Sequence, residues 1–165
     1  MNSDRLLAAQ QGDLLALNDV LDAAMPWVST LCGSIALDAG PDAAQETLIQ
    51  VMRDLPGLRD PKAFRSWVRR IATREAIRHA TRRRRDSPLE DPDRIRDAQG
   101  LDPTLRHDVT RVLSDLSPDQ RAILVLRDLE GLSEAEAAEV LDVARGTIKS
   151  RLNRAREAFR KRWPT

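Results

Sequence analysis

The chain has 165 residues, of which 32% are charged and 3% aromatic, and its formal net charge is +1. Its single cysteine excludes an internal disulfide, and its two histidines have no ligand companions at metal spacing, so we expect no metal site and no cofactor. The N-terminus does not resemble a signal peptide, and no apolar run approaches the length of a membrane span. These features predict a soluble cytoplasmic protein without membrane insertion.

The near-neutral total charge hides two basic segments that alternate with acidic ones. Residues 1–62 hold four basic and nine acidic side chains (net −5), and residues 63–85 hold nine arginines and one glutamate (net +8). Residues 86–120 hold four basic and nine acidic side chains (net −5), and residues 121–165 hold ten and seven (net +3). Two basic segments on one small protein indicate two contacts with a polyanion, while the acidic segments suit another partner or limit non-specific binding.

The apolar residues recur at spacings of three and four without period-two alternation, which predicts an all-α protein. One amphipathic helix should run from Leu14 to Met25 and end before Pro26, because the residue before a proline is pushed out of the helical region. A second apolar stripe, from Val28 to Ile35, marks the next helix.

A third helix should follow the turn at residues 38–42, with Asp42 as its N-cap, and end at Pro56-Gly57. Its apolar stripe consists of Ala44, Leu48, Val51, Met52 and Leu55. Its polar face consists of Gln45, Glu46, Gln50 and Arg53.

A fourth helix should begin near Asp60-Pro61, bury Phe64, Trp67, Val68 and Ile71, and run into the arginines at 82–85. Arginines recur every four residues down this helix, at Arg70, Arg74, Arg78 and Arg82. Repulsion between neighbouring arginines costs roughly 0.2–0.5 kcal/mol per pair unless an anion relieves it. The stripe therefore favours contact with nucleic acid over a merely solvated face. Trp67 lies on the buried side, so we expect core packing rather than base stacking.

Residues 86–104 contain repeated prolines, glycine and aspartates with few large apolar side chains, and they predict an acidic flexible linker. The chain therefore divides into two small helical domains, residues 1–85 and 105–165. The second opens with a helix striped by Leu105, Val109, Val112, Leu113 and Leu116.

The last third has the outline of a helix-turn-helix. Capping boxes start helices at Ser117-Pro118-Asp119-Gln120 and at Ser133-Glu134-Ala135-Glu136. A turn near residues 142–146 precedes a last helix whose apolar stripe is Ile148, Leu152, Ala155 and Phe159. Its other face is basic and polar, with Arg145, Lys149, Ser150, Asn153, Arg154 and Arg156. Such a face suits the DNA major groove, although Ala144 stands where a capping serine or threonine would help.

Four motifs in this order resemble one family. They are residues 42–47 (DAAQET), residues 64–72 (FRSWVRRIA) with the arginines that follow, residues 116–121 (LSPDQR) and residues 146–156 (GTIKSRLNRAR). They resemble the extracytoplasmic-function, or group four, sigma factors of bacterial RNA polymerase. Residues 14–85 resemble the promoter-melting region two, and residues 105–163 resemble region four.

The resemblance implies a sigma factor that binds core RNA polymerase and directs promoter-specific transcription initiation. By it, the core polymerase is bound by Asp42, Gln45, Glu46, Gln50 and Arg53. The minus-ten element is read and melted by the loop 58–62 and the next helix, with Asp60, Lys62, Arg65, Trp67, Arg70, Arg74 and Arg78. The minus-thirty-five element is read by Arg145, Thr147, Lys149, Ser150, Arg151, Asn153 and Arg154. The linker would thread toward the RNA exit channel.

The family usually has Asn at the position of Arg74 and Asp near Arg78, so the melting surface here is more basic. Ala43 and Ala44 replace bulkier apolar residues. We expect no sensing extension after Thr165. By the resemblance, control comes from outside the chain, typically from an anti-sigma factor, although some members are controlled only by their own synthesis. We expect the free protein to be monomeric.

Two other functions remain open. A conventional helix-turn-helix regulator would explain the C-terminal domain but not the basic helix at 65–85. A sigma-like decoy would bind polymerase without opening promoters. We do not expect an enzyme, because no nucleophile with base and orienting group, phosphate loop or metal cluster can be assembled.

Overall fold

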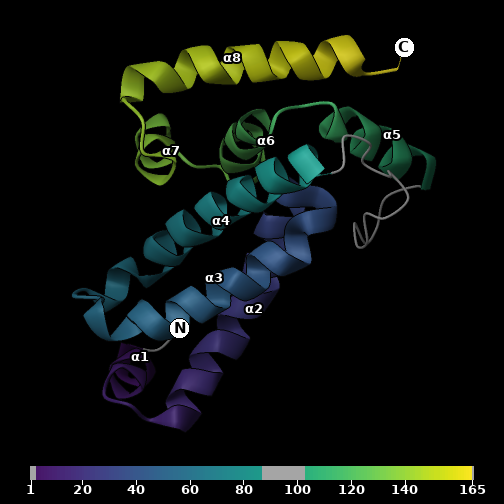
Figure 1. The fold of residues 1–165 in the computed structure, drawn as a ribbon. Coiled ribbons are helices and arrows are strands. Elements are labelled where there is room, and N and C mark those ends of the chain that lie inside the picture. The colour runs from purple at the N-terminus through teal and green to yellow at the C-terminus, as the bar shows by residue number, and fades with distance from the viewer. Residues whose placement is uncertain (1–2, 87–102, 165) are drawn as a thin grey trace.

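The computed structural model describes residues 3–86 and 103–164, and every regular element in these ranges is helical (Figure 1). The N-terminal half contains α1 (Ser3–Gln10), α2 (Leu14–Ala36), α3 (Gly40–Asp54) and α4 (Phe64–Asp86). Short 3-10 turns η1 (Leu37–Ala39), η2 (Leu55–Gly57) and η3 (Pro61–Ala63) join them. The C-terminal half contains α5 (Pro103–Ser114), α6 (Pro118–Leu124), the π-helical turn η5 (Val125–Leu129), α7 (Glu134–Leu141) and α8 (Arg145–Arg162). Most of the predicted linker lies outside the described residues.

Helix α2 continues through Pro26, so the predicted break there is wrong. A proline inside a helix removes one backbone hydrogen bond and costs about 3 kcal/mol. Val20 before the proline, and Val28 and Leu31 after it, are buried along the same helix. Burying each such side chain contributes about 1.5–3 kcal/mol, so the shared apolar face outweighs the local cost of Pro26.

Helix α3 begins two residues before the predicted N-cap. Its N-cap is Ala39, whose side chain makes no capping bond, and Asp42 lies in the first turn instead. A Cβ atom on Gly40 would meet the Cα of Gly33 at 2.6 Å, so the glycine permits close packing of α3 on α2. The carboxylate of Asp42 still favours the helix through the macrodipole.

The start of α4 agrees with the prediction. The Asp60 carboxylate accepts a hydrogen bond from the Lys62 amide, and η3 leads directly into α4. Helix α1, which was not predicted, buries Leu6 and Ala9 against the neighbouring elements.

Both predicted capping boxes of the C-terminal half are confirmed. Ser117 and Gln120 exchange hydrogen bonds at the start of α6, as do Ser133 and Glu136 at the start of α7. The N-cap of α8 is Ala144, without a side-chain capping bond, as expected.

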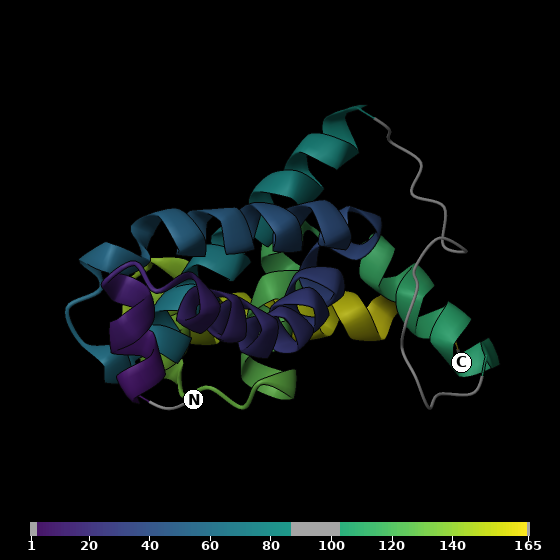
Figure 2. The same ribbon diagram turned by 90° about the horizontal axis from the view of Figure 1, so that it is seen from below.

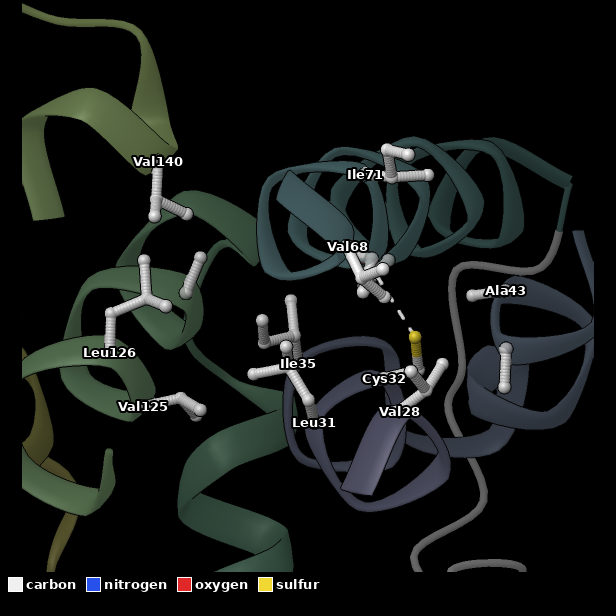
Figure 3. Close-up of a cluster of buried hydrophobic side chains, with 14 of the residues drawn as sticks. Val28, Leu31, Cys32, Ile35, Ala43, Val68, Ile71, Val125, Leu126 and Val140 are labelled. Carbon is white, nitrogen blue, oxygen red and sulfur yellow. Dashed lines mark hydrogen bonds between the residues drawn. The ribbon is translucent and has the colours of Figure 1, made fainter. Parts of the chain in front are cut away.

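The two halves pack against each other through a continuous apolar core. Helices α6 and α7 lie against α4, and α6 also lies against α2. Val125 and Leu126 lie beside Leu31 and Ile35 in the interior (Figure 3). Helix α8 lies on the outer side of α6 and α7 (Figure 1), and α1 and α5 lie at opposite ends of the molecule (Figure 2).

Polar contacts also cross between the halves. The buried Arg121 donates from Nε to the Ile35 carbonyl at 2.6 Å. Arg69 of α4 donates to the Glu130 carboxylate at 3.1 Å. These contacts join elements far apart in sequence and help to hold the two halves in this arrangement.

One apolar stretch is longer than we expected. The continuous helical stretch Leu14–Gly57 includes an 18-residue window of mean hydropathy 1.4, enough by length and composition to cross a membrane. The expectation that no run approaches this length is therefore wrong. In this fold 44% of the window is buried, and the core helix of a soluble protein meets the same criterion.

Candidate nucleic-acid and protein interfaces

Helix α8 presents most of its predicted DNA-binding side chains to solvent. Arg145, Lys149, Ser150, Asn153 and Arg154 are exposed, and Thr147 and Arg151 are half-buried. The opposite side of the helix, with Ile148 and Leu152, is buried against the C-terminal core. Because this buried side fixes the rotation of α8, the exposed basic side faces away from the rest of the protein.

Arg156 forms an ion pair with a carboxylate of the protein. Its guanidinium donates to Asp128 of η5, from Nε at 3.2 Å and from Nη2 at 2.5 Å. A bidentate pair of this kind fixes the geometry of both groups. Arg156 therefore ties α8 to η5, although the sequence pattern placed it on the basic face.

The arginine stripe of α4 is exposed, as its spacing predicts. Arg70, Arg74, Arg78 and Arg82 all lie at the surface. Arg69, beside the stripe, is turned toward the C-terminal half through its ion pair with Glu130.

An anion for the stripe is present within the protein itself. Glu75 is 6% exposed, and its carboxylate accepts a hydrogen bond from Arg78 Nε at 2.7 Å. Arg74 Nε lies 3.6 Å from its other oxygen. Repulsion between the arginines is thus partly relieved without nucleic acid, which corrects the inference drawn from their spacing. Glu75 was missed because its position in the sequence does not reveal its burial.

The start of α4 gathers the remaining residues of the predicted minus-ten set. Asp60 and Lys62 are exposed. The Arg65 guanidinium lies 5.1 Å from the Trp27 ring centroid, within the range of a cation–π contact. Trp67 is half-buried and packs beside Phe64 with ring centroids 6.1 Å apart, as core packing predicts.

The outer face of α3 is less polar than predicted. Asp42, Gln45 and Arg53 are exposed, and Glu46 and Gln50 are half-buried. Met52, which we assigned to the buried stripe, is 47% exposed, and Ile49 is 36% exposed. Val51 takes the inward position, and a helix turns by about 100° per residue, so Met52 faces outward. Two apolar side chains are thus exposed beside the polar residues of this face.

The α3 face and the α4 stripe are joined by a hydrogen bond. Arg74 Nη2 donates to Gln50 Oε1 at 2.9 Å, and Gln50 Nε2 donates to the Asp54 carboxylate at 3.2 Å. The candidate protein-binding face and the candidate DNA-binding stripe therefore meet along one edge of the N-terminal half.

Comparison with known proteins agrees with this architecture. Residues 23–86 match the family model "Sigma-70 region 2", and residues 106–159 match "Sigma-70, region 4". The chain is 32% identical to the ECF RNA polymerase sigma-E factor of Escherichia coli strain K12, over 91% of this chain and 87% of that protein. The corresponding factor of Haemophilus influenzae is also 32% identical, over 90% and 87%.

Two solved structures share the fold. The sigma factor RpoE of Bartonella quintana, crystallised with the anti-sigma factor NepR, has a TM-score of 0.71 and 27% identity, covering 88% of this chain and 94% of that one. CnrH, in complex with the cytosolic domain of CnrY, has a TM-score of 0.66, covering 97% and 96%, and at 23% identity shows the fold alone. With both sigma regions in order and these relatives along most of its length, the chain belongs to the ECF sigma factors of RNA polymerase.

Proposed function

We propose that this sigma factor contacts promoters at two places, with α4 at the minus-ten element and α8 at the minus-thirty-five element. Sigma factors direct transcription initiation and are in general not enzymes. We propose that this chain likewise has no enzymatic activity. The observation that carries the proposal is the pair of separate, exposed basic surfaces, each on a helix whose opposite side is buried. Basic side chains supply phosphate contacts, and Arg, Lys and Asn read base edges.

The division of labour follows the two halves. Residues 1–85 bind core polymerase, recognise the minus-ten element and melt it. Residues 105–165 read the minus-thirty-five element, and residues 86–104 connect them. The α8 residues that contact DNA are Arg145, Thr147, Lys149, Ser150, Arg151, Asn153 and Arg154. The residues for the minus-ten element are Asp60, Lys62, Arg65, Trp67, Arg70, Arg74 and Arg78.

Core polymerase binds the outer face of α3. The proposed contacts are Asp42, Gln45, Glu46, Gln50 and Arg53, with the exposed side chains of Ile49 and Met52 among them. Interfaces of this kind combine apolar contacts with a polar rim.

The two halves must separate for both elements to be read together. The elements lie about 25 base pairs apart, roughly 85 Å of DNA at 3.4 Å per base pair. A compact chain of 165 residues has a radius of gyration of about 15 Å, too small to span that distance. Core polymerase would supply the free energy that replaces the contacts between the halves.

Regulation by an anti-sigma factor in the cytoplasm completes the proposal. The Bartonella quintana relative was crystallised with such a factor. A protein that binds both halves in their packed arrangement would oppose their separation and lower the amount of factor able to join polymerase.

The proposal is tested by adding the protein to core polymerase and mapping transcript starts on random genomic fragments. Starts should cluster downstream of one shared pair of elements and require both components. Tight, specific binding by the free protein with no effect on polymerase would identify a conventional regulator instead. Binding to polymerase without new starts would identify a decoy.

The α3 assignment has its own variant. Gln45→Ala with Glu46→Lys should reduce retention on immobilised core polymerase by at least about tenfold, because a reversed charge placed in an interface costs several kcal/mol. Asp22→Lys, a charge reversal at an exposed position of α2, is the matched control. Retention equal to that of the wild type would remove α3 as the docking helix.

A further inference from the structure

Glu75 is the one acidic residue of the basic segment 63–85, and α4 turns it inward. Its side chain is 8% exposed, whereas those of Arg74 and Arg78 are 58% and 57% exposed. The carboxylate thus lies beneath two surface guanidiniums, bonded to Arg78 and 3.6 Å from Arg74 Nε. Two positive groups at the surface share one buried negative group.

This arrangement restricts both arginines. Glu75 lies on α4 close to the fully buried Ala72 and Ala76. A buried carboxylate is costly unless it is paired, so moving Arg78 into solvent would cost the hydrogen bond that satisfies this charge. Arg74 is held on its other side by the Gln50 side chain. By contrast, among the residues that the structure describes, Arg82 pairs with the exposed Asp86 alone, at 3.9 Å.

We propose that Glu75 is a positioning residue that holds Arg74 and Arg78 in the geometry in which they bind the phosphates of a separated strand. The inference rests on the proposed role of α4 in melting. Side chains ordered before binding lose less entropy when they bind, so positioning favours the open promoter.

Net charge alone predicts the opposite effect. Glu75 lowers the charge of the stripe by one, so its neutralisation should strengthen phosphate binding if charge alone matters. Whether neutralising Glu75 weakens or strengthens phosphate binding therefore distinguishes positioning of the arginines from a simple effect of net charge.

The test compares Glu75→Gln with Asp86→Asn in complexes with core polymerase. Both changes remove one negative charge from α4, but only the first removes the buried partner of the stripe. Open complexes are measured by permanganate reactivity of unpaired thymines on an intact duplex and on a template with a pre-melted bubble. Glu75→Gln should give about fivefold to tenfold fewer open complexes on the duplex, the scale of the net contribution of one hydrogen bond. On the bubble, Glu75→Gln should approach the wild type, and Asp86→Asn should match the wild type on both templates.

Several outcomes would overturn the inference. Equal or greater opening by Glu75→Gln would show that Glu75 does not position the stripe, and a loss that persists on the bubble together with lost polymerase binding would show a purely structural role. A wild-type protein that opens no promoter would refute the proposed function itself, and this result differs from a defect confined to the Glu75→Gln variant. If Glu75→Gln fails to fold, nitrogen-15 relaxation of the arginine side chains in the wild type tests whether Glu75 orders the stripe. Arg78 Nε should be ordered and Arg82 Nε mobile, and equal mobility would overturn the inference.

Discussion

Arg121 is the clearest single residue with which to test the packing of the two halves. Its side chain is fully buried. The Nε atom donates to the Ile35 carbonyl at 2.6 Å, and Nη1 donates to the Leu113 and Leu116 carbonyls at 3.1 and 3.2 Å. One guanidinium thus holds the end of α2 and the segment between α5 and α6. Arg121→Met keeps an unbranched chain but removes these donors.

Each of the three hydrogen bonds contributes about 1 kcal/mol net, so the variant should lose roughly 3 kcal/mol of the free energy of unfolding. A protein of this size shifts its melting temperature by about 2–4 °C per kcal/mol, which predicts a decrease of roughly 6–12 °C. Calorimetry measures the shift, with Arg154→Met on the exposed face of α8 as the control. A melting temperature within about 2 °C of the wild type would refute the bridging role of Arg121.

Three further predictions concern other parts of the molecule. Burial raises the pKa of the Cys32 thiol to about 12, so at pH 8 only about one thiol in ten thousand is ionised. Iodoacetamide should therefore label Cys32 rapidly only after the protein unfolds. Fast labelling of the native protein would contradict this burial. Hydrogen bonds from Ser133 lower the pKa of Glu136. The Glu136 carboxylate therefore stabilises the fold above its unfolded-state pKa, and this stabilisation is lost as the pH falls through its folded-state pKa. Glu136→Ala should reduce the melting temperature at pH 7, and an equal reduction at pH 3 would contradict this linkage. Lys149→Ala and Asn153→Ala should each relax upstream-element preference by roughly 1–3 kcal/mol in competition binding by the holoenzyme, whereas Arg154→Ala should weaken binding to all sequences; uniform losses in all three would leave α8 a phosphate binder.

The parts of the fold that sequence predicted well are those with local chemical signals. Ser117 and Ser133 each stand three residues before a side chain that completes a capping box, and both boxes form. The spacing of Ile148, Leu152 and Ala155 fixed which side of α8 is buried. Such patterns depend only on neighbours within one or two helical turns, so they can be read without the fold.

Tertiary packing decided the features that sequence did not predict. Pro26 favours a break, but burial on both sides keeps α2 continuous. Met52 fits an apolar stripe, but Val51 takes the inward place and leaves Met52 outside. Glu75 resembles an isolated surface acid until α4 is placed, and Arg121 lies within a recognisable motif that does not reveal its bond to Ile35.

Joined to core polymerase, this chain should open promoter DNA. Permanganate footprinting of a promoter recovered with the wild-type holoenzyme measures that opening. Unpaired thymines should appear around the minus-ten element and the start site when both components are present, and should be absent with either alone. Protection of duplex DNA by the free chain, with no reactive thymines when polymerase is added, would contradict the account.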